Sequence, residues 1–153
     1  MNTSDNEIYV RLEYSRRENK SRNFRLDVEL HLPGKGITAV FGESGSGKTT
    51  LLRCIAGLEQ SALGIVKMKS EIWQEGNLFL STNLRHVGYV FQEPSLFPHL
   101  TVQGNIQFGV KRRGQIVDDN DFAEIVRLLD LGGLLNAYPS KLSGGEKQRA
   151  AIA

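Results

Sequence analysis

The chain has 153 residues, and its 19 basic and 17 acidic side chains leave a formal net charge of +2. Hydrophobic residues make up 40% and charged residues 24%, which is the composition of a globular domain and excludes a disordered or collagen-like chain. The apolar runs are much shorter than the roughly 20 residues of a membrane-spanning helix. The near-balance of charge gives no indication of nucleic-acid binding. A single cysteine, Cys54, excludes an internal disulfide.

Apolar and polar residues alternate in the first half of the chain, with the period of β-strands. Two strands are predicted within residues 7–32, joined by a charged turn near residues 15–23. Residues 37–41, Ile-Thr-Ala-Val-Phe, form a continuous apolar run typical of a strand that is covered on both faces. Residues 64–81 predict a hairpin, and residues 87–91 predict another short strand.

Helical spacing of apolar residues appears in three other places. One helix is predicted over residues 51–58, and the chain is predicted to turn helical again from about Thr101. In a third helix, apolar residues recur at i, i+3, i+4 and i+7 from Phe122, and Asn120 or Asp121 is expected to cap it.

The strongest local signal is Gly42-Glu-Ser-Gly-Ser-Gly-Lys-Thr-Thr50, which fits the P-loop pattern G-x-x-x-x-G-K-[ST]. Glycine lets backbone N–H groups turn inward around an anion, and the following helix directs its positive end at the same point. Lys48 is predicted to supply a charge to the β- and γ-phosphates, and Thr49 a hydroxyl to Mg²⁺. The predicted nucleotide-binding residues of this loop are Gly42, Glu43, Ser44, Gly45, Ser46, Gly47, Lys48, Thr49 and Thr50.

A second glycine motif, Leu142-Ser-Gly-Gly-Glu-Lys-Gln-Arg149, lies near the end of the sequence. Ser143 and Glu146 have the spacing of a capping box, which by itself explains a helix start. Gly144 and Gly145 weaken such a helix by roughly 1 kcal/mol each relative to alanine. Their presence indicates that something, such as a phosphate, approaches the helix N-terminus closely. From this motif alone, both interpretations remain open.

This second motif resembles the signature motif of ATP-binding cassette (ABC) ATPases. Between it and the P-loop, Gly88-Tyr-Val-Phe-Gln92 and Pro94-Ser-Leu-Phe-Pro-His-Leu-Thr-Val102 resemble the Q-loop and the start of the helical subdomain of that family. The motifs follow the family's order, and the resemblance covers essentially the whole chain from about residue 8.

The resemblance implies an α/β fold, with a P-loop NTPase core of ABC type, an N-terminal antiparallel β subdomain and a helical subdomain. Residues 1–153 would be a single, incomplete nucleotide-binding domain, with the helical subdomain at about residues 93–141 and the C-terminal half of the core missing. The cofactors implied are ATP and Mg²⁺.

By the same resemblance, Mg²⁺ would be held by Thr49 and Gln92. Ser143, Gly144 and Gly145 would bind the γ-phosphate of an ATP held by a second ATP-binding subunit, in a head-to-tail dimer. The family stacks an aromatic ring on adenine, and the two candidates are Tyr14 and Phe24.

The chain ends at Ala153, inside the helix that the signature motif begins. In the family, the Walker B aspartate, the general-base glutamate and the switch histidine come later, so no catalytic residue is assigned in this chain. We therefore expect little or no ATP hydrolysis by the chain alone. Residues 37–41 would lack neighbouring strands, which predicts poor solubility or marginal stability.

The sequence of residues 32–45 resembles that of the ATPase subunit of molybdate importers. The function implied by this resemblance is that of an ATP-binding subunit that energises such an importer. The alternatives are the ATPase of a sulfate, polyamine or sugar importer, and a non-catalytic nucleotide-binding remnant or interaction module. The expected partners are transmembrane permease subunits and a second ATP-binding subunit, with no nucleic acid. Membrane contact would occur only through the permease, at the cytoplasmic face of the inner membrane.

Overall fold

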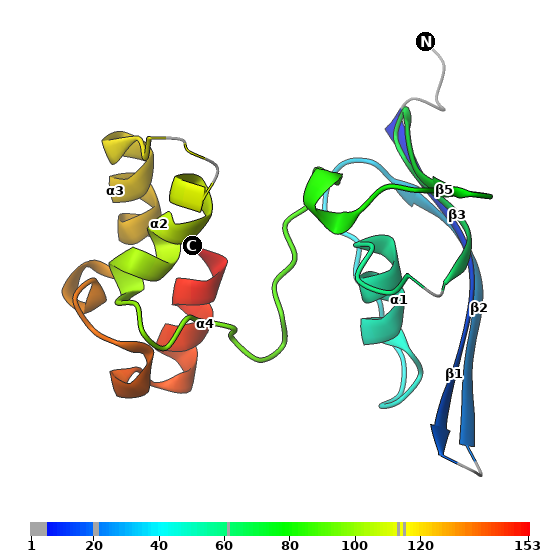
Figure 1. Ribbon diagram of the computed structural model, residues 1–153, viewed down its shortest axis with the longest axis horizontal. Coiled ribbons are helices and arrows are strands. Elements are labelled where there is room, and N and C mark those ends of the chain that lie inside the picture. Colours follow the sequence, from blue (N-terminus) through cyan, green and yellow to red (C-terminus); the bar gives the residue numbers. More distant parts are fainter. Residues whose placement is uncertain (1–5, 20–21, 61, 113, 115) are drawn as a thin grey trace. The chain divides into compact units, whose positions relative to one another are not determined.

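The computed structural model describes residues 6–153, apart from residues 20, 21, 61, 113 and 115. The chain divides into two compact units, Met1–Gly88 and Tyr89–Ala153 (Figure 1). Each unit contains its own hydrophobic core. The first unit holds the strands and one α-helix, and the second unit is helical.

An antiparallel sheet with the strand order β2-β1-β3-β4-β5 forms the body of the first unit. Its strands are β1 (Glu7–Asn19), β2 (Arg22–Pro33), β3 (Leu63–Met68), β4 (Glu71–Glu75) and β5 (Leu78–Phe79). The predicted strand pair within residues 7–32 and the hairpin within residues 64–81 are confirmed. The predicted turn at 15–23 is too long, because β1 and β2 continue to pair as far as Asn19 and Arg22.

One face of this sheet is covered by α1 (Lys48–Ile55), the helix predicted after the P-loop (Figure 1). The even-numbered residues from Ile8 to Tyr14 of β1 and from Phe24 to Leu30 of β2 point to this face, as the two-residue period of a strand requires. The buried residues of this core are Val10, Leu12, Tyr14, Leu26, Leu51, Cys54, Ala62, Val66 and Trp73.

The side chain of Arg85 lies at the C-terminal end of α1 and is only 4% exposed. Its guanidinium donates hydrogen bonds to the carbonyl oxygens of Ile55 at 2.5 Å, Leu80 at 2.8 Å and Cys54 at 3.4 Å. The guanidinium carbon also lies 5.6 Å from the ring centroid of Trp73. A positive charge at this point interacts favourably with the negative end of the helix dipole.

Two predicted strands, over residues 37–41 and 87–91, are wrong: both segments lack regular structure. Ile37 is 99% and Phe41 90% exposed. A strand that is buried on both faces needs hydrogen-bonded neighbours, and the described strands all pair within the antiparallel sheet of the first unit.

The second unit consists of α2 (Val102–Arg112), α3 (Asp119–Leu128) and α4 (Gly144–Ile152), with short 3₁₀ turns η3 (Gly132–Leu134) and η4 (Pro139–Lys141). The buried residues of its hydrophobic core are Val102, Leu131, Leu142 and Ala150. Among the described residues, none of the helices has the length and apolar character required to cross a bilayer.

The helices predicted from residue 101 and around Phe122 are confirmed, but the expected caps of the latter are wrong. Asp118 is the N-cap of α3, and its carboxylate accepts hydrogen bonds from the backbone N–H groups of Asn120 and Asp121 at 2.9 and 3.0 Å. Asn120 and Asp121 therefore lie one and two positions after the first residue of the helix, and their backbone N–H groups are the donors that the cap satisfies.

Candidate nucleotide-binding site

The loop before α1 has the backbone conformation that its glycines predict. Gly45 and Gly47 have φ values of 81° and 97°, in the left-handed region that disfavours other residues. Gly47 is the N-cap of α1 and provides no side-chain cap, and no acidic residue lies in the first turn of the helix. The positive end of α1 is therefore not neutralised by its own sequence, which favours binding of an anion there.

Lys48 spans this loop. Its Nζ atom donates hydrogen bonds to the carbonyl oxygens of Gly42 at 2.8 Å and Glu43 at 2.6 Å, and to the hydroxyl of Ser46 at 3.3 Å. These bonds hold the ammonium group over the loop, which is exposed along residues 42–46. The arrangement gives a fixed positive charge at an accessible, glycine-rich helix start.

The exposed hydroxyl of Thr49 belongs to the first turn of the same helix. Hydroxyl and amide oxygens are ligands of the kind that Mg²⁺ accepts, and Mg²⁺ on a nucleotide usually keeps several waters and uses only one or two protein ligands. Thr49 and the amide oxygen of Gln92 fit this chemistry. Within the described residues, there is no cluster of three or more His, Cys, Asp or Glu side chains suited to a metal ion.

The structure distinguishes the two aromatic candidates for adenine stacking. Tyr14 is 5% exposed, belongs to the core, and its hydroxyl donates to a carboxylate oxygen of Glu59 at 3.4 Å. Phe24 is only partly buried, and its ring lies against the loop: a Cβ atom added to Gly47 would be 2.7 Å from Phe24 Cζ. Of the two candidates, Phe24 is therefore the one that borders the predicted phosphate-binding loop.

The other predicted site residues belong to the second unit. Gln92 is exposed, in a segment without regular structure. Ser143 caps α4, and its backbone N–H and its hydroxyl donate to one carboxylate oxygen of Glu146 at 2.7 and 2.8 Å. These two bonds lower the pKa of Glu146 below its ordinary value. The predicted capping box is confirmed.

Gly144 and Gly145 form the first two positions of α4. A Cβ atom added to either residue would meet no atom within 4 Å among the described residues. Packing within the unit thus gives no steric reason for glycine at these positions, and the helix start is open to an external group.

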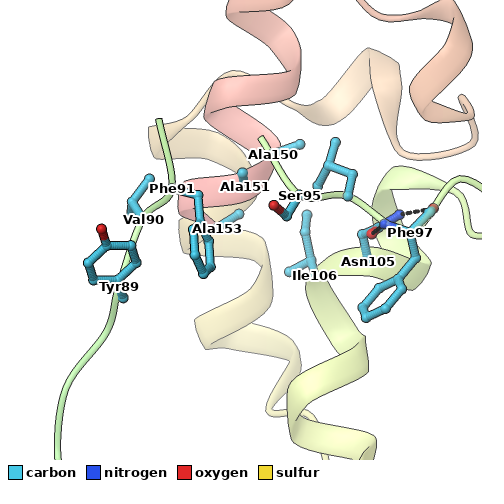
Figure 2. Close-up of a pocket in the computed structure, with 11 residues that line it drawn as sticks. Tyr89, Val90, Phe91, Ser95, Phe97, Asn105, Ile106, Ala150, Ala151 and Ala153 are labelled. Atoms are coloured by element: carbon cyan, nitrogen blue, oxygen red, sulfur yellow. Dashed lines mark hydrogen bonds between the residues drawn. The ribbon is translucent and has the colours of Figure 1, made fainter. Parts of the chain in front are cut away.

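A cavity of about 250 Å³ lies in the second unit (Figure 2). It is lined mainly by apolar side chains, including those of Val90, Phe91 and Ile106, and by no charged residue. The amide of Asn105 holds one wall by hydrogen bonds to the backbone N–H and carbonyl of Phe97 at 2.7 and 3.2 Å. The cavity can receive an apolar group.

The glycine-rich loop with Lys48 at the start of α1 has the sequence pattern and the helix-start geometry of a P-loop. The ABC transporter family matches residues 26–153, and the chain belongs to this family. A solved ATP-binding cassette, a dimer in a post-hydrolysis state with bound ADP and phosphate, has the same fold, with a TM-score of 0.70 and 22% identity over 95% of this chain and 67% of that one.

Named relatives are more similar in sequence. The chain is 55% identical over 130 residues to the molybdenum import ATP-binding protein ModC of Thiobacillus denitrificans, covering 85% of this chain and 36% of that protein. It is 56% identical over 130 residues to ModC of Methylococcus capsulatus, with the same coverage. The chain thus spans about a third of the length of these relatives. The resemblance to ABC ATPases, and among them to those of molybdate importers, is confirmed.

Proposed function

We propose that the chain binds Mg²⁺ and ATP and forms part of the ATP-hydrolysing subunit of a molybdate importer. The observation that carries this proposal is the loop in which Lys48 lies over two backbone carbonyls at the unneutralised start of α1. The similarity to two ModC proteins supports molybdate over sulfate, polyamines or sugars as the transported solute.

In this proposal, the loop and the first turn of α1 bind the phosphates, and Lys48 supplies the charge next to the terminal groups. Mg²⁺, when bound, would neutralise phosphate charge, and Thr49 and Gln92 would hold it. Phe24, the aromatic side chain that borders Gly47, would stack on the adenine ring.

The start of α4 would act on a second nucleotide. Ser143, Gly144 and Gly145 would bind the γ-phosphate of ATP held by another ATP-binding subunit, in a head-to-tail dimer. The open space around both glycines supports this role, because it lets a phosphate reach the helix N-terminus without a steric barrier.

Permease subunits would dock on the helical subdomain at about residues 93–141. The uncharged cavity beside Phe97 and Ile106 suits an apolar side chain of such a partner. The protein would then lie at the cytoplasmic face of the inner membrane and touch the membrane through the permease alone.

For the chain alone, we propose nucleotide binding without useful turnover. The hydrogen bonds of Lys48 go to two carbonyls and a hydroxyl, and no carboxylate among the described residues forms an ion pair with it. Positioning and charge stabilisation by the loop supply only part of the catalysis of phosphoryl transfer, which also needs a group that orients the attacking water. Steady hydrolysis by the purified chain would contradict this part of the proposal.

The test of nucleotide binding is calorimetric titration of the chain with ATP and Mg²⁺. We expect Lys48→Ala to weaken binding at least about tenfold, the effect of losing one charge-assisted contact. Lys35→Ala is the matched control, since Lys35 is an exposed lysine outside the loop, and it should leave the affinity unchanged. Absence of binding by the unmodified chain, or equal binding by Lys48→Ala, would overturn the proposal.

The solute is tested in cells that lack their own ModC. A ModC protein whose matching segment is replaced by residues 26–153 should restore molybdate-dependent growth at limiting molybdate. The same chimera with Lys48→Ala should fail. A chimera that hydrolyses ATP in vitro but does not restore growth would count against a molybdate importer.

A further inference from the structure

The β1–β2 pair extends past the rest of the sheet as a two-stranded ribbon. β1 pairs with β3 only as far as Glu13 and Leu63, whereas the β1–β2 ladder continues through Tyr14–Leu26 and Ser15–Arg25 to Arg16–Phe24 and beyond. The part of the ribbon beyond Glu13 therefore has β3 on neither edge, and its inner face lies next to the loop that precedes α1.

The register assigns Arg16 to that inner face. Side chains alternate along a strand, and directly opposed residues of two strands share a face. Tyr14 and Leu26 are an opposed pair, and both are buried in the core that α1 covers. Arg16 and Phe24 are the next opposed pair on the same face.

Arg25 provides the contrast on the outer face. It opposes Ser15 in the ladder and lies one position from Phe24 along β2. Its guanidinium is 3.6 Å from a carboxylate oxygen of Asp27, a neighbour on that outer face. Two arginines of the same ribbon, at similar distance from its tip, thus belong to opposite faces.

The neighbour of Arg16 touches the phosphate loop. Phe24 Cζ would lie 2.7 Å from a Cβ atom added to Gly47, the residue before Lys48. Opposed side chains in an antiparallel pair have Cβ atoms only about 5 Å apart. The long, exposed side chain of Arg16 therefore starts beside Phe24 and can extend over the loop region.

We propose that Arg16 is a further nucleotide-binding residue, whose guanidinium binds a phosphate of the nucleotide held by residues 42–50. A guanidinium matches phosphate oxygens with two parallel hydrogen bonds, and its charge adds to that of Lys48 and of the α1 N-terminus. The ribbon would then form one wall of the site, with Phe24 next to the base and Arg16 next to the phosphates. This inference rests on the proposed nucleotide binding.

The test compares Mg²⁺–ATP and adenosine binding by the unmodified chain, Arg16→Ala, Arg16→Lys and Arg25→Ala, at low and high salt. Arg16→Ala should weaken ATP binding by about 5- to 10-fold and Arg16→Lys by about 2- to 3-fold, with smaller losses at high salt. Adenosine, which has no phosphate, should bind Arg16→Ala and the unmodified chain equally. Arg25→Ala removes the same charge from the outer face and should leave ATP affinity within about twofold.

Equal ATP affinity of Arg16→Ala and the unmodified chain would overturn the role of Arg16 while leaving the proposed function intact. An equal loss in Arg16→Ala and Arg25→Ala would also overturn it, because the effect would then come from net charge. A loss of adenosine binding as large as that of ATP would place Arg16 at the base and contradict a phosphate contact. If the unmodified chain binds no ATP, the proposed function itself fails. Far-ultraviolet circular dichroism of each variant confirms that the fold is retained.

Discussion

Replacement of Arg85 by methionine tests how much the buried cation at the end of α1 stabilises the first unit. The substitution removes hydrogen bonds to the carbonyls of Ile55 and Leu80 at 2.5 and 2.8 Å, and a weaker one to Cys54 at 3.4 Å. Each buried carbonyl left without a partner costs about 1–3 kcal/mol. The lost interactions with the helix dipole and with the ring of Trp73 add about 1 kcal/mol each.

Relief of desolvation offsets part of this loss. The Nη2 atom of Arg85 is buried and has no hydrogen-bond partner among the described residues, and burial lowers the pKa of the guanidinium. Removing this incompletely paired cation recovers about 1–3 kcal/mol, and the flexible methionine fills part of the vacated space. With two carbonyls left without a partner, the net expectation is a decrease of about 4 kcal/mol, within a range of about 1–7 kcal/mol, in the free energy of unfolding.

The assay is urea unfolding followed by the fluorescence of Trp73, the chain's single tryptophan, which is 1% exposed. With a slope of about 2 kcal/mol per molar urea, a decrease of about 4 kcal/mol should lower the midpoint by about 2 M. Arg25→Met is the matched control: the Arg25 side chain is 71% exposed, so its loss should change stability by less than about 0.5 kcal/mol. A similar, small shift in both variants would refute the reasoning that the carbonyls depend on Arg85.

Three further predictions concern single side chains. The hydrogen bonds from Ser143 lower the pKa of Glu146, so this interaction stabilises α4 at pH values above the unfolded-state pKa and is lost as pH falls through the lower folded-state pKa. Ser143→Ala should therefore raise the pKa of Glu146 measured by NMR titration. An unchanged pKa would contradict this. Burial raises the pKa of Cys54 to about 11. Alkylation of this thiol at pH 8 should therefore be at least about tenfold slower in the native chain than in urea. Equal rates would show that the thiol is accessible in the native chain. Gly145→Ala should increase the stability of the second unit by about 0.5 kcal/mol in thermal unfolding, since the added methyl group meets no atom of the described residues within 4 Å. A clear loss of stability would reveal a contact there.

Local patterns predicted most of the secondary structure, because strand and helix periods are properties of neighbouring residues. They also predicted the P-loop and the capping box of Ser143, whose geometries depend on a few consecutive residues. They did not identify the residue that caps α3. Asp118, Asn120 and Asp121 are all suitable N-cap residues, and the sequence does not fix the residue at which the helix begins.

Features that depend on distant parts of the chain were not predictable in this way. The apolar run at residues 37–41 has the composition of a strand, but composition does not reveal whether pairing strands are present. No sequence pattern predicted that Arg85 would be buried at the end of α1, because this role depends on backbone carbonyls about thirty residues earlier in the sequence. Tyr14 and Phe24 looked equivalent in sequence, and only the packing of Phe24 against Gly47 separates them.

The division into two hydrophobic cores has a consequence for how the chain's cooperativity is measured. The buried members of the first core lie between Val10 and Trp73, and those of the second between Val102 and Ala150. Tryptophan emission therefore follows only the first core, whereas three of the four described α-helices, which dominate circular dichroism, belong to the second unit. The unfolding midpoints from the two probes can differ even when each core unfolds in a single all-or-none step. Different midpoints would then indicate separate unfolding of the two cores rather than a folding intermediate within one of them.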